Sequence, residues 1–386
     1  MKILMIGPHD IYSASEPWTT RIKNLAYQFA KKGHAVKLIY FPLDNNNAGR
    51  RFEENGYEVI SLSRRLGSRV FLENIVKVTR LAGWADVVHF QKCYYYASLP
   101  ALIGAWFKNK PSHYDWDDWE TKIFYYSNPK NRVLGGFIHI LERLIPLAAD
   151  TVSVSSKRLR GLCLRFGVME DDIFPAPVGA DISRFRPCPE SSQGIKTRYN
   201  IDHHLVLYIG QLHGGQYAEL FIKAAGFIRR KTNDVTFMIV GDGYRAGELK
   251  EMAAREGLGA RMIFTGPVPH ELVPFYINSA DVCVACFEDN DITQCKSPLK
   301  IAEYLACGKA VVASDVGEVG SMINDAGLLV RPGDYSALAE GILKLTADNE
   351  LRRALSSKAR ARALEKYNWD FTASSLLAAY NRYLRG

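Results

Sequence analysis

The stretch SPLKIAEYLACGKAVVASDVGE, residues 297–318, contains a complete helix-to-strand unit. Ser297 and Pro298 predict a helix start, with a capping hydroxyl followed by a proline at the first helical position. Gly308 predicts the helix end, because a left-handed residue commonly follows the last turn. A buried strand over 310–313 comes next. The stretch therefore predicts one unit of an α/β fold, with one lysine and one acid inside a mostly apolar helix.

Lys300 and Glu303 allow two interpretations. They stand three residues apart on one helix face, so they could form a surface ion pair. However, Lys300 lies in the first turn, where the helix dipole disfavours a cation unless an anion is also present. A bound phosphate would satisfy both the lysine and the first N–H groups of the helix. The residues of this helix alone leave both interpretations open.

Length and composition indicate a two-domain globular protein. The chain has 386 residues, of which 47% are hydrophobic and 23% charged, which suits two domains of ordinary size. Lys2–Ile6 predicts a first strand rather than a signal peptide, and no apolar run is long enough to span a bilayer. The seven cysteines are scattered, which favours reduced thiols and a cytoplasmic location. Cys283 and Cys286 predict a buried strand rather than a metal site.

The net charge of +8 is concentrated in the first half of the chain. Residues 1–190 contain 26 Lys and Arg against 19 Asp and Glu. Such an excess could meet an anionic membrane surface, or it could form an ordinary solvated face. No nucleic-acid module accompanies it, so we expect no nucleic-acid partner and at most peripheral binding at the inner face of the cell membrane. The excess includes Arg50, Arg51, Arg64, Arg65, Arg69, Lys77 and Arg80.

Strand and helix patterns alternate along the chain and restart once. The pattern of parallel strands with covering helices begins at Lys2 and starts again at the run 205–209. The boundary lies in the proline-rich stretch 175–189. Two doubly wound domains predict a ligand cleft at the carboxyl ends of their sheets. Before the restart, strands are expected at 2–6, 36–41, 59–62 and 86–90, then running into 113–115, and at 151–154.

Five segments together resemble glycosyltransferase family 4, the group 1 glycosyltransferases of the GT-B fold. The strongest is 297–318, which resembles that family's SPxK…EYxAxGKxVVxSD block. The resemblance implies an α/β, GT-B architecture of two Rossmann-like doubly wound domains facing across a cleft. Residues 1–182, completed by a returning C-terminal helix 370–386, would bind the acceptor, and residues 183–369 would bind a nucleotide-sugar. The other segments are ERLIPLAADTVSVSS at 142–156, PVGADISRF at 177–185, IVGDG at 239–243 and FTGPVPHELVPFYINSADV at 264–282.

The resemblance also implies the roles of site residues in the second domain. Glu303 would accept hydrogen bonds from the ribose hydroxyls, and the first turn of its helix would bind the diphosphate. Gly241 and Gly243 would allow close approach of the backbone, although an ordinary tight turn explains them equally well. The implied donor-binding set is Gly210, Gln211, Gly241, Gly243, Phe264, Pro267, Val268, Ser297, Pro298, Leu299, Lys300 and Glu303, in which Phe264, Pro267 and Val268 lie against the base.

The chain departs from the family pattern at three places. Cys295 stands where the family usually has a second glutamate. Gln211 and Gln216 stand where an arginine and a lysine often clamp the diphosphate. The usual glycine pair is absent from GPHDIYSASEPW, residues 7–18. These departures leave an altered or lost activity open, although the intact SPLK motif and Glu303 argue against total loss. The acids that could replace the missing glutamate are Glu288, Asp289 and Asp291.

The string SHYDWDDWE, residues 112–120, is the most polar cluster of the first domain. We expect one of Asp115, Asp117 and Asp118 to orient the acceptor hydroxyl or to support the departing sugar. The alternative is a capped turn with solvated acids. A metal held by the DxD pattern is rejected, because GT-B enzymes generally work without metal. His113 could equally be a satisfied strand histidine.

Taken together, the resemblance implies a retaining glycosyltransferase. It would transfer a sugar from a nucleoside diphosphate, most simply UDP or GDP, to a glycan or lipid-linked acceptor in surface polysaccharide or glycoconjugate biosynthesis. Lys300 would stabilise the departing diphosphate, and no further cofactor or metal is expected. The alternatives are a sugar-nucleotide epimerase, a phosphorylase, for which no pyridoxal site is visible, and a non-catalytic partner subunit.

Overall fold

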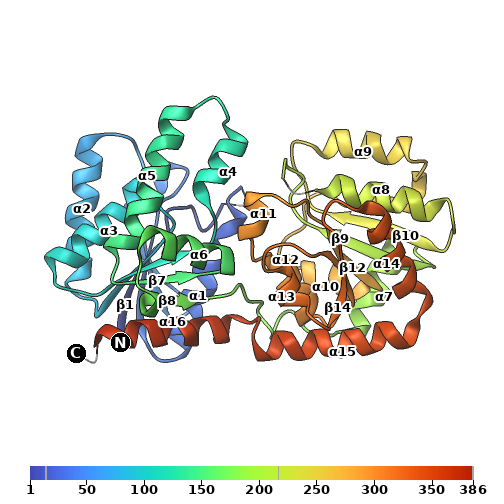
Figure 1. Ribbon diagram of the computed structural model, residues 1–386. Helices are drawn as coiled ribbons and strands as arrows, with labels where there is room; N and C mark the ends of the chain where they lie inside the picture. The colour runs from blue at the N-terminus through green and yellow to red at the C-terminus, as the bar shows by residue number, and fades with distance from the viewer. Residues whose placement is uncertain (14, 216, 385–386) are drawn as a thin grey trace. The chain divides into compact units, whose positions relative to one another are not determined.

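The chain folds into two compact units, as a computed structural model that describes residues 1–13, 15–215 and 217–384 shows. Unit 1 comprises Met1–Pro177 together with the segment that starts at Trp369, and unit 2 comprises Val178–Asn368 (Figure 1). The sequence-based division after residue 182 lies a few residues beyond the observed one. The restart of the strand–helix pattern predicted this two-unit organisation.

Unit 1 is built on an eight-stranded sheet with the order β3-β4-β2-β1-β5-β6-β7-β8. All neighbouring strands pair in parallel except β3 and β4, which form an antiparallel hairpin. The six predicted strands are confirmed, but β3 and β8 were missed. The turn between β3 and β4 is formed by Asn55 and Gly56, with φ angles of 50° and 82°. The strands are β1 (Lys2–Ile6), β2 (Ala35–Tyr40), β3 (Arg51–Glu54), β4 (Tyr57–Ser61), β5 (Val87–Gln91), β6 (Ser112–Trp116), β7 (Thr151–Val154) and β8 (Ile173–Pro175).

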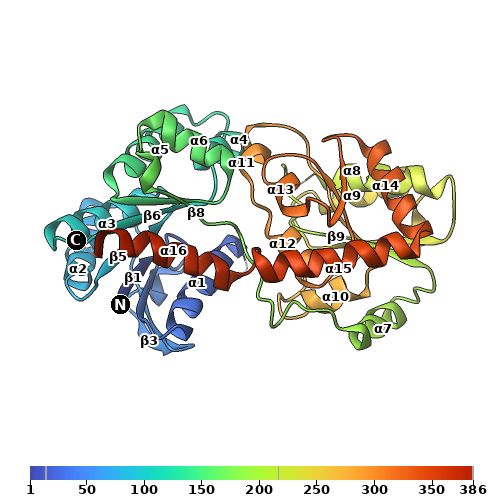
Figure 2. The same ribbon diagram turned by 60° about the horizontal axis from the view of Figure 1, so that its bottom comes forward.

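The helices of unit 1 cover both faces of this sheet, and the last one comes from the end of the chain. Thr372 Oγ1 donates to the carbonyl of Pro177 at 2.8 Å, and Tyr380 Oη lies 2.7 Å from Nδ1 of His89. The returning C-terminal helix is therefore confirmed, and Figure 2 shows it lying across the sheet beside α1. The helices are α1 (Thr20–Lys31), α2 (Ser68–Ala82), α3 (Tyr95–Phe107), α4 (Glu120–Ser127), α5 (Arg132–Ala148), α6 (Lys157–Phe166) and α16 (Trp369–Leu384).

Unit 2 is a six-stranded, fully parallel sheet with the order β11-β10-β9-β12-β13-β14. The chain moves outward from β9 first on one side and later on the other, so the strand order reverses beside β9. Ligands of doubly wound folds bind at the carboxyl ends of the strands at such a reversal. The strands are β9 (His204–Ile209), β10 (Val235–Val240), β11 (Met262–Phe264), β12 (Val282–Ala285), β13 (Val311–Ser314) and β14 (Gly327–Val330).

The helices of unit 2 include α12, which lies within the stretch 297–318. Gly308 has a φ of 64° just past its end, which confirms the predicted stop. Cys283 and Cys286 are buried in the core at the end of β12, as predicted. No helix among the described residues is both long and apolar enough to cross a membrane. The helices are α7 (Pro189–Arg198), α8 (Ala218–Arg229), α9 (Ala246–Arg255), α10 (Val273–Ser279), α11 (Asp291–Cys295), α12 (Leu299–Ala306), α13 (Val319–Ile323), α14 (Tyr335–Ala347) and α15 (Asn349–Glu365).

Candidate functional site

The loops after β9 and β10 are packed backbone against backbone. Gly241 follows β10 with a φ of 139°, and a Cβ there would lie 2.0 Å from the carbonyl oxygen of Gly210. A Cβ on Gly243 would lie 2.4 Å from the carbonyl oxygen of Leu212. Any side chain at these two positions would collide with the neighbouring loop. Loop packing therefore accounts for both glycines without a ligand.

Gly210 has a different neighbour, the ammonium group of Lys300. A Cβ on Gly210 would lie 2.7 Å from Lys300 Nζ. The lysine side chain reaches from the first turn of α12 to the end of β9, where Nζ lies 4.2 Å from the ring centroid of Tyr208 and 5.8 Å from that of Phe287. Gly210 thus leaves room for the ammonium group at the strand end.

The ammonium group of Lys300 is buried and, among the described residues, has no hydrogen-bond partner. Burial lowers the pKa of Lys300 to about 8. Burying an ammonium group without a counter-charge costs free energy, and the two aromatic rings recover only part of that cost. An anion bound against Nζ would supply the missing partner, so the geometry fits the phosphate interpretation.

Glu303 does not form the surface ion pair with Lys300 that was the alternative. Its residue is only 4% exposed, and its Oε1 lies 2.7 Å from Nε2 of His270. Burial opposes protonation of His270, but the hydrogen bond and charge of Glu303 raise the pKa of this histidine above its usual value. Within the described part of the chain, Oε2 of Glu303 receives no hydrogen bond, so one oxygen is available to a ligand hydroxyl.

His270 is a site residue that the sequence analysis did not select. It lies in the loop before α10, and its Nδ1 faces Arg184 Nη1 at 3.4 Å. The histidine therefore connects Glu303 to a guanidinium group from a distant part of unit 2. The segment PVPH, residues 267–270, belongs to the family-like stretch 264–282, but nothing in its spacing indicates that the histidine reaches a carboxylate 33 positions later.

The predicted cap of α12 is wrong. The helix begins at Leu299, and Pro298 is its N-cap residue in an extended conformation, with no side-chain capping bond. The hydroxyl of Ser297 instead accepts the backbone N–H of Val178 at 3.4 Å. The first N–H groups of any helix lack intrahelical partners. The backbone N–H groups of Leu299 and Lys300 therefore point out of the N-terminal end of the helix. The side chain of Lys300 starts in the same turn.

The segment predicted to contact the base forms the turn after β11. Gly266 has a φ of 74°, and its carbonyl accepts the N–H of Gly241 at 3.1 Å, so this turn lies beside the β10 loop. Phe264 and Val268 are half-buried and Pro267 is exposed. The structure thus brings this turn, Gly241 and Gly210 to one edge of the sheet. Gln211 is half-buried beside them, and Gln216 lies outside the described residues.

Cys295 is buried in the last turn of α11 and offers no polar group to a ligand. Helix α11 starts with a capping box in which the Asn290 side chain accepts the N–H of Thr293. Of the three acids considered as replacements, Glu288 and Asp289 are exposed and Asp291 is half-buried. None of them occupies the position of Cys295, so a substitute for the missing glutamate remains only a prediction.

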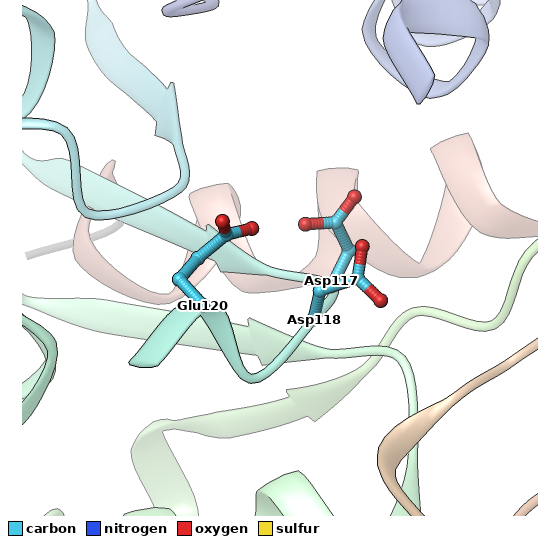
Figure 3. A group of neighbouring side chains, drawn as sticks. All are labelled: Asp117, Asp118 and Glu120. Atoms are coloured by element: carbon cyan, nitrogen blue, oxygen red, sulfur yellow. The ribbon is translucent and has the colours of Figure 1, made fainter. Parts of the chain in front are cut away.

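In unit 1, a buried lysine gathers the acids that follow β6. Lys92 is 3% exposed and has a positive φ of 61°. Its Nζ lies 3.1 Å from Asp117 Oδ1, 3.2 Å from Asp118 Oδ2 and 2.5 Å from Glu120 Oε1. Burial opposes the charge, but these three carboxylates raise the pKa of Lys92 well above its usual value. Figure 3 shows Asp117 and Asp118 on the loop after β6 and Glu120 at the start of α4.

Asp117 and Asp118 differ in how far they remain available. The side chain of Asp118 is 29% exposed and that of Asp117 is 13% exposed. Asp117 Oδ2 also accepts from Gln91 Nε2 at 2.8 Å. Burial and the charge of Asp118 raise the pKa of Asp117 to about 7, against the opposing charge of Lys92. Asp117 can therefore exchange a proton near neutral pH.

Asp115 was also predicted as a catalytic candidate, but unlike Asp117 and Asp118 it is not accessible. It is completely buried and receives two hydrogen bonds from Arg21, each of 2.7 Å, and one from Ser153. Burial opposes ionisation, but Arg21 holds the pKa of Asp115 below its usual range. Both oxygens are occupied, so this aspartate joins α1 to the sheet.

His113 is a satisfied strand histidine. Its Nδ1 lies 2.8 Å from Thr151 Oγ1 and its Nε2 2.9 Å from Ser153 Oγ, and the residue is fully buried. It therefore has no free nitrogen for an acceptor or a metal. Both partners, Thr151 and Ser153, come from β7, the neighbouring strand.

One group of acids in unit 1 has the spacing of a metal site: Asp117, Asp118 and Glu120. Lys92 Nζ already lies within 3.2 Å of a carboxylate oxygen of each. A divalent cation placed among these oxygens would have to displace a strongly held ammonium group. The donor set therefore fits a lysine better than a metal.

The loop after β1, which lacks the family's glycine pair, contributes charged groups of its own. Glu16 Oε1 lies 3.1 Å from His9 Nδ1 and 3.2 Å from Arg64 Nη1. Burial opposes ionisation, but these partners lower the pKa of Glu16 to about 2. The His9 ring lies 4.9 Å from that of Tyr94, whose hydroxyl donates to Glu120. These contacts connect the β1 loop to the acids around Lys92.

Comparison with known protein families matches both units. A family model described as "Glycosyl transferase 4-like domain" matches residues 19–179, and one described as "Glycosyl transferases group 1" matches residues 203–348. The first model ends close to the observed division between the units, and the second lies within unit 2. Together they cover most of the chain.

Curated relatives and solved structures agree with this match. The chain is 28% identical over 191 residues to alpha-D-kanosaminyltransferase of Streptomyces kanamyceticus, covering 48% of each protein. It is 26% identical over 253 residues to D-inositol 3-phosphate glycosyltransferase of Nocardia farcinica, covering 63% of this chain and 54% of that protein. The matched region therefore spans about half the length of these relatives. Anabaena Alr3699/HepE, solved in complex with UDP and glucose, superposes with a TM-score of 0.76 at 18% identity over 99% of both chains, which shows a shared GT-B fold.

Proposed function

Because this chain belongs to the group 1 glycosyltransferases of family 4, we propose that it transfers a sugar from a nucleoside diphosphate sugar to an acceptor. Unit 2 binds the donor and unit 1 binds the acceptor. The acceptor is a glycan or a lipid-linked sugar, and the product enters a surface polysaccharide or glycoconjugate. The anomeric configuration is retained.

The observation that carries this proposal is the unpartnered ammonium group of Lys300. It lies at the N-terminus of α12, where N–H groups and the helix dipole favour an anion. A diphosphate bound there would receive a hydrogen bond from Nζ and from the first N–H groups of the helix. The same contacts stabilise the negative charge that develops on the diphosphate as the sugar leaves, which is what this class of reaction requires.

Glu303 supplies the second part of the donor site. One oxygen is fixed by His270 at 2.7 Å, and the other is available to accept from a ribose hydroxyl. The base lies against the turn formed by Phe264, Pro267 and Val268. UDP is the first nucleotide to test, because the similar HepE structure contains UDP, and GDP is the second.

Asp117 and Asp118 are the residues of unit 1 that we assign to the acceptor. Lys92 holds both carboxylates in place. Asp117, with a pKa raised to about 7, accepts a hydrogen bond from the acceptor hydroxyl and takes up its proton as the new glycosidic bond forms. We expect the reaction to proceed without a metal ion.

The test is thermal unfolding of the full chain with UDP, GDP, ADP or dTDP. Binding to the native state raises the melting temperature by mass action. One nucleotide should stabilise the wild type, and Lys300→Met and Glu303→Gln should each reduce the shift. Lys344→Met, which removes the same charge from the exposed surface of α14, should retain it. If no nucleotide raises the melting temperature, the donor site is not functional and the partner-subunit alternative replaces this proposal.

Activity assays distinguish a glycosyltransferase from the remaining alternative, a sugar-nucleotide epimerase. A glycosyltransferase releases free nucleoside diphosphate in proportion to the glycosylated acceptor. An epimerase converts the nucleotide-sugar with no acceptor present and leaves the diphosphate bond intact. Conversion of the sugar without release of nucleotide would contradict the transferase proposal while preserving the donor site.

A further inference from the structure

Helix α5 of unit 1 exposes an apolar stripe. Val133, Phe137, Ile140, Leu144 and Leu147 are 88%, 42%, 55%, 53% and 45% exposed. They follow one another at intervals of four, three, four and three residues, so they lie along one face of the helix. The outward face of a helix on a soluble domain is normally polar, so a continuous apolar face marks an interaction surface.

The opposite face of α5 explains why the stripe is left outside. Leu141, Glu142 and Ile145 are buried against the unit. A Cβ on Gly135 would lie 2.3 Å from the ring of Tyr125, so α4 packs closely on α5 at this glycine. The inward face is already covered by its own unit. On the stripe, the Phe137 ring lies 6.0 Å from that of Tyr95 of α3, but all five side chains remain at least 42% exposed.

The charges around the stripe have one sign. Residues 121–149 contain a single acid, Glu142, and it is 1% exposed and accepts the N–H groups of Glu120 and Thr121. The exposed surface of the α4–α5 segment is therefore free of carboxylates. Its exposed basic residues are Lys130, Arg132 and Arg143, and none of them makes an ion pair within the described chain.

The basic patch that the sequence suggested lies elsewhere and is different in character. Arg51 pairs with Glu58, Arg64 with Glu16, and Arg69 with Glu73. Because these arginines have their own carboxylates, much of their charge is compensated within unit 1. Helix α2 also exposes apolar side chains, Leu72 and Val76, but its surface carries the exposed carboxylate of Glu73. The α4–α5 segment has an apolar stripe and basic residues with no exposed carboxylate between them.

A pocket of about 630 Å³ lies at the end of α5. Its lining includes Ala148, Trp106 of α3, Lys110 and Asp150. Trp106 is 76% exposed, and its neighbour Phe107 is 64% exposed. Exposed aromatic side chains of this kind are typical of surfaces that rest at the boundary between lipid and water.

We propose that the α4–α5 face binds an anionic membrane surface. The stripe from Val133 to Leu147 inserts among the acyl chains, while Lys130, Arg132 and Arg143 contact the lipid phosphates. A second copy of this chain is a poorer occupant, because it would present the same positive charge to an identical face. The proposal goes beyond the proposed transfer reaction and does not depend on donor binding.

The location of the face has a consequence for the acceptor. Helix α4 begins at Glu120, which is one of the three acids around Lys92. If the proposed function is correct, a membrane-bound unit 1 meets its acceptor at the lipid surface, which favours a lipid-linked acceptor over a free glycan.

The test is co-sedimentation of the full chain with vesicles. One set contains phosphatidylcholine alone, and the other contains phosphatidylcholine mixed with phosphatidylglycerol. We expect binding to the anionic vesicles only, weakened by added salt. Replacing two stripe residues, Ile140→Glu and Leu144→Glu, should weaken binding about tenfold or more. Arg132→Gln with Arg143→Gln should also weaken it about tenfold or more.

A matched control is available on α2. Leu72 and Val76 are 59% and 58% exposed, so Leu72→Glu with Val76→Glu makes the same change on another helix of unit 1 and should leave vesicle binding intact. Equal loss in both double variants, or no binding by the wild type, would overturn the proposal. Dimerisation that only the α5 variant abolishes would overturn it in favour of a second copy. Nucleotide binding should persist in every variant, so a failure here is distinct from a failure of the donor site.

Discussion

Two lysines with buried ammonium groups, one in each unit, stand in opposite electrostatic situations. Lys92 has three carboxylates within 3.2 Å of Nζ, and they raise its pKa. Lys300 has no hydrogen-bond partner within the described residues, and burial lowers its pKa to about 8. The first lysine is satisfied by the fold, whereas the second is left for something that the fold does not provide.

The difference separates a structural cation from a binding cation. A buried ion pair is costly to break because removal of one partner leaves uncompensated charges behind. A buried ammonium group without a partner lowers the stability of the folded protein, and binding of an anion removes this destabilisation. Stability and ligand binding should therefore respond in opposite ways when each lysine is replaced by the uncharged, similarly long methionine.

The largest effect is expected for Lys92→Met. Removal of this ammonium group leaves Asp117, Asp118 and Glu120 close together without a cation, so the free energy of unfolding should fall by about 3–5 kcal/mol. Urea denaturation measures the loss. Lys300→Met should lose no stability in the same experiment, and an equal loss in both variants would remove the distinction between the two lysines.

Lys300→Met should instead affect the reaction. Loss of a group that stabilises charge in the transition state lowers the rate by a factor of about 10²–10³. The measurement is kcat/KM for nucleoside diphosphate release in the presence of acceptor. A variant with wild-type kcat/KM would show that the buried ammonium group does not act on the diphosphate.

The pH dependence of stability should reveal the unpaired state of Lys300 directly. Its pKa is lower in the folded protein, about 8, than the ordinary 10.5, so the unfolded chain binds more protons between these values. Stability therefore rises with pH across this window, by roughly 3 kcal/mol. The measurement is the free energy of unfolding of wild type and of Lys300→Met across this pH window. The variant should lack the rise. If both proteins show the same pH dependence, Lys300 already has a counter-ion.

A smaller effect is expected from Glu303→Gln. The substitution keeps the shape of the side chain but weakens its hydrogen bonds to His270 and to the ribose, so nucleotide binding should weaken by a factor of about 10–100. Calorimetric titration of the nucleoside diphosphate measures the change. A matched substitution at the exposed Glu340 of α14, Glu340→Gln, should have no effect.

The sequence predicted what local patterns and motif order can determine. The pattern correctly indicated the helix-to-strand unit within 297–318, the strand Thr151–Val154 and the glycine after α12. Side-chain partners were harder to predict. The acids around Lys92 follow it by 25 to 28 positions, and His270 precedes Glu303 by 33, so only the folded chain shows that they meet.

Two errors have identifiable physical causes. Ser297 fits the composition of a cap, but Pro298 takes the N-cap position and the serine hydroxyl bonds to Val178 instead. Asp115 fits a polar cluster, but it lies inside the fully buried strand β6 and pairs with Arg21. In both cases a tertiary contact decides between two local possibilities.

The most direct test of the account compares two ligands on two proteins. Calorimetric titrations of the selected nucleoside diphosphate and of its nucleoside, on wild type and on Lys300→Met, isolate the contribution of the diphosphate. We predict that wild type prefers the diphosphate and that the substitution reduces this preference by a factor of about 10–100, as expected for loss of a charged hydrogen bond. An unchanged preference would show that Lys300 is not the receptor for the diphosphate and would contradict the account.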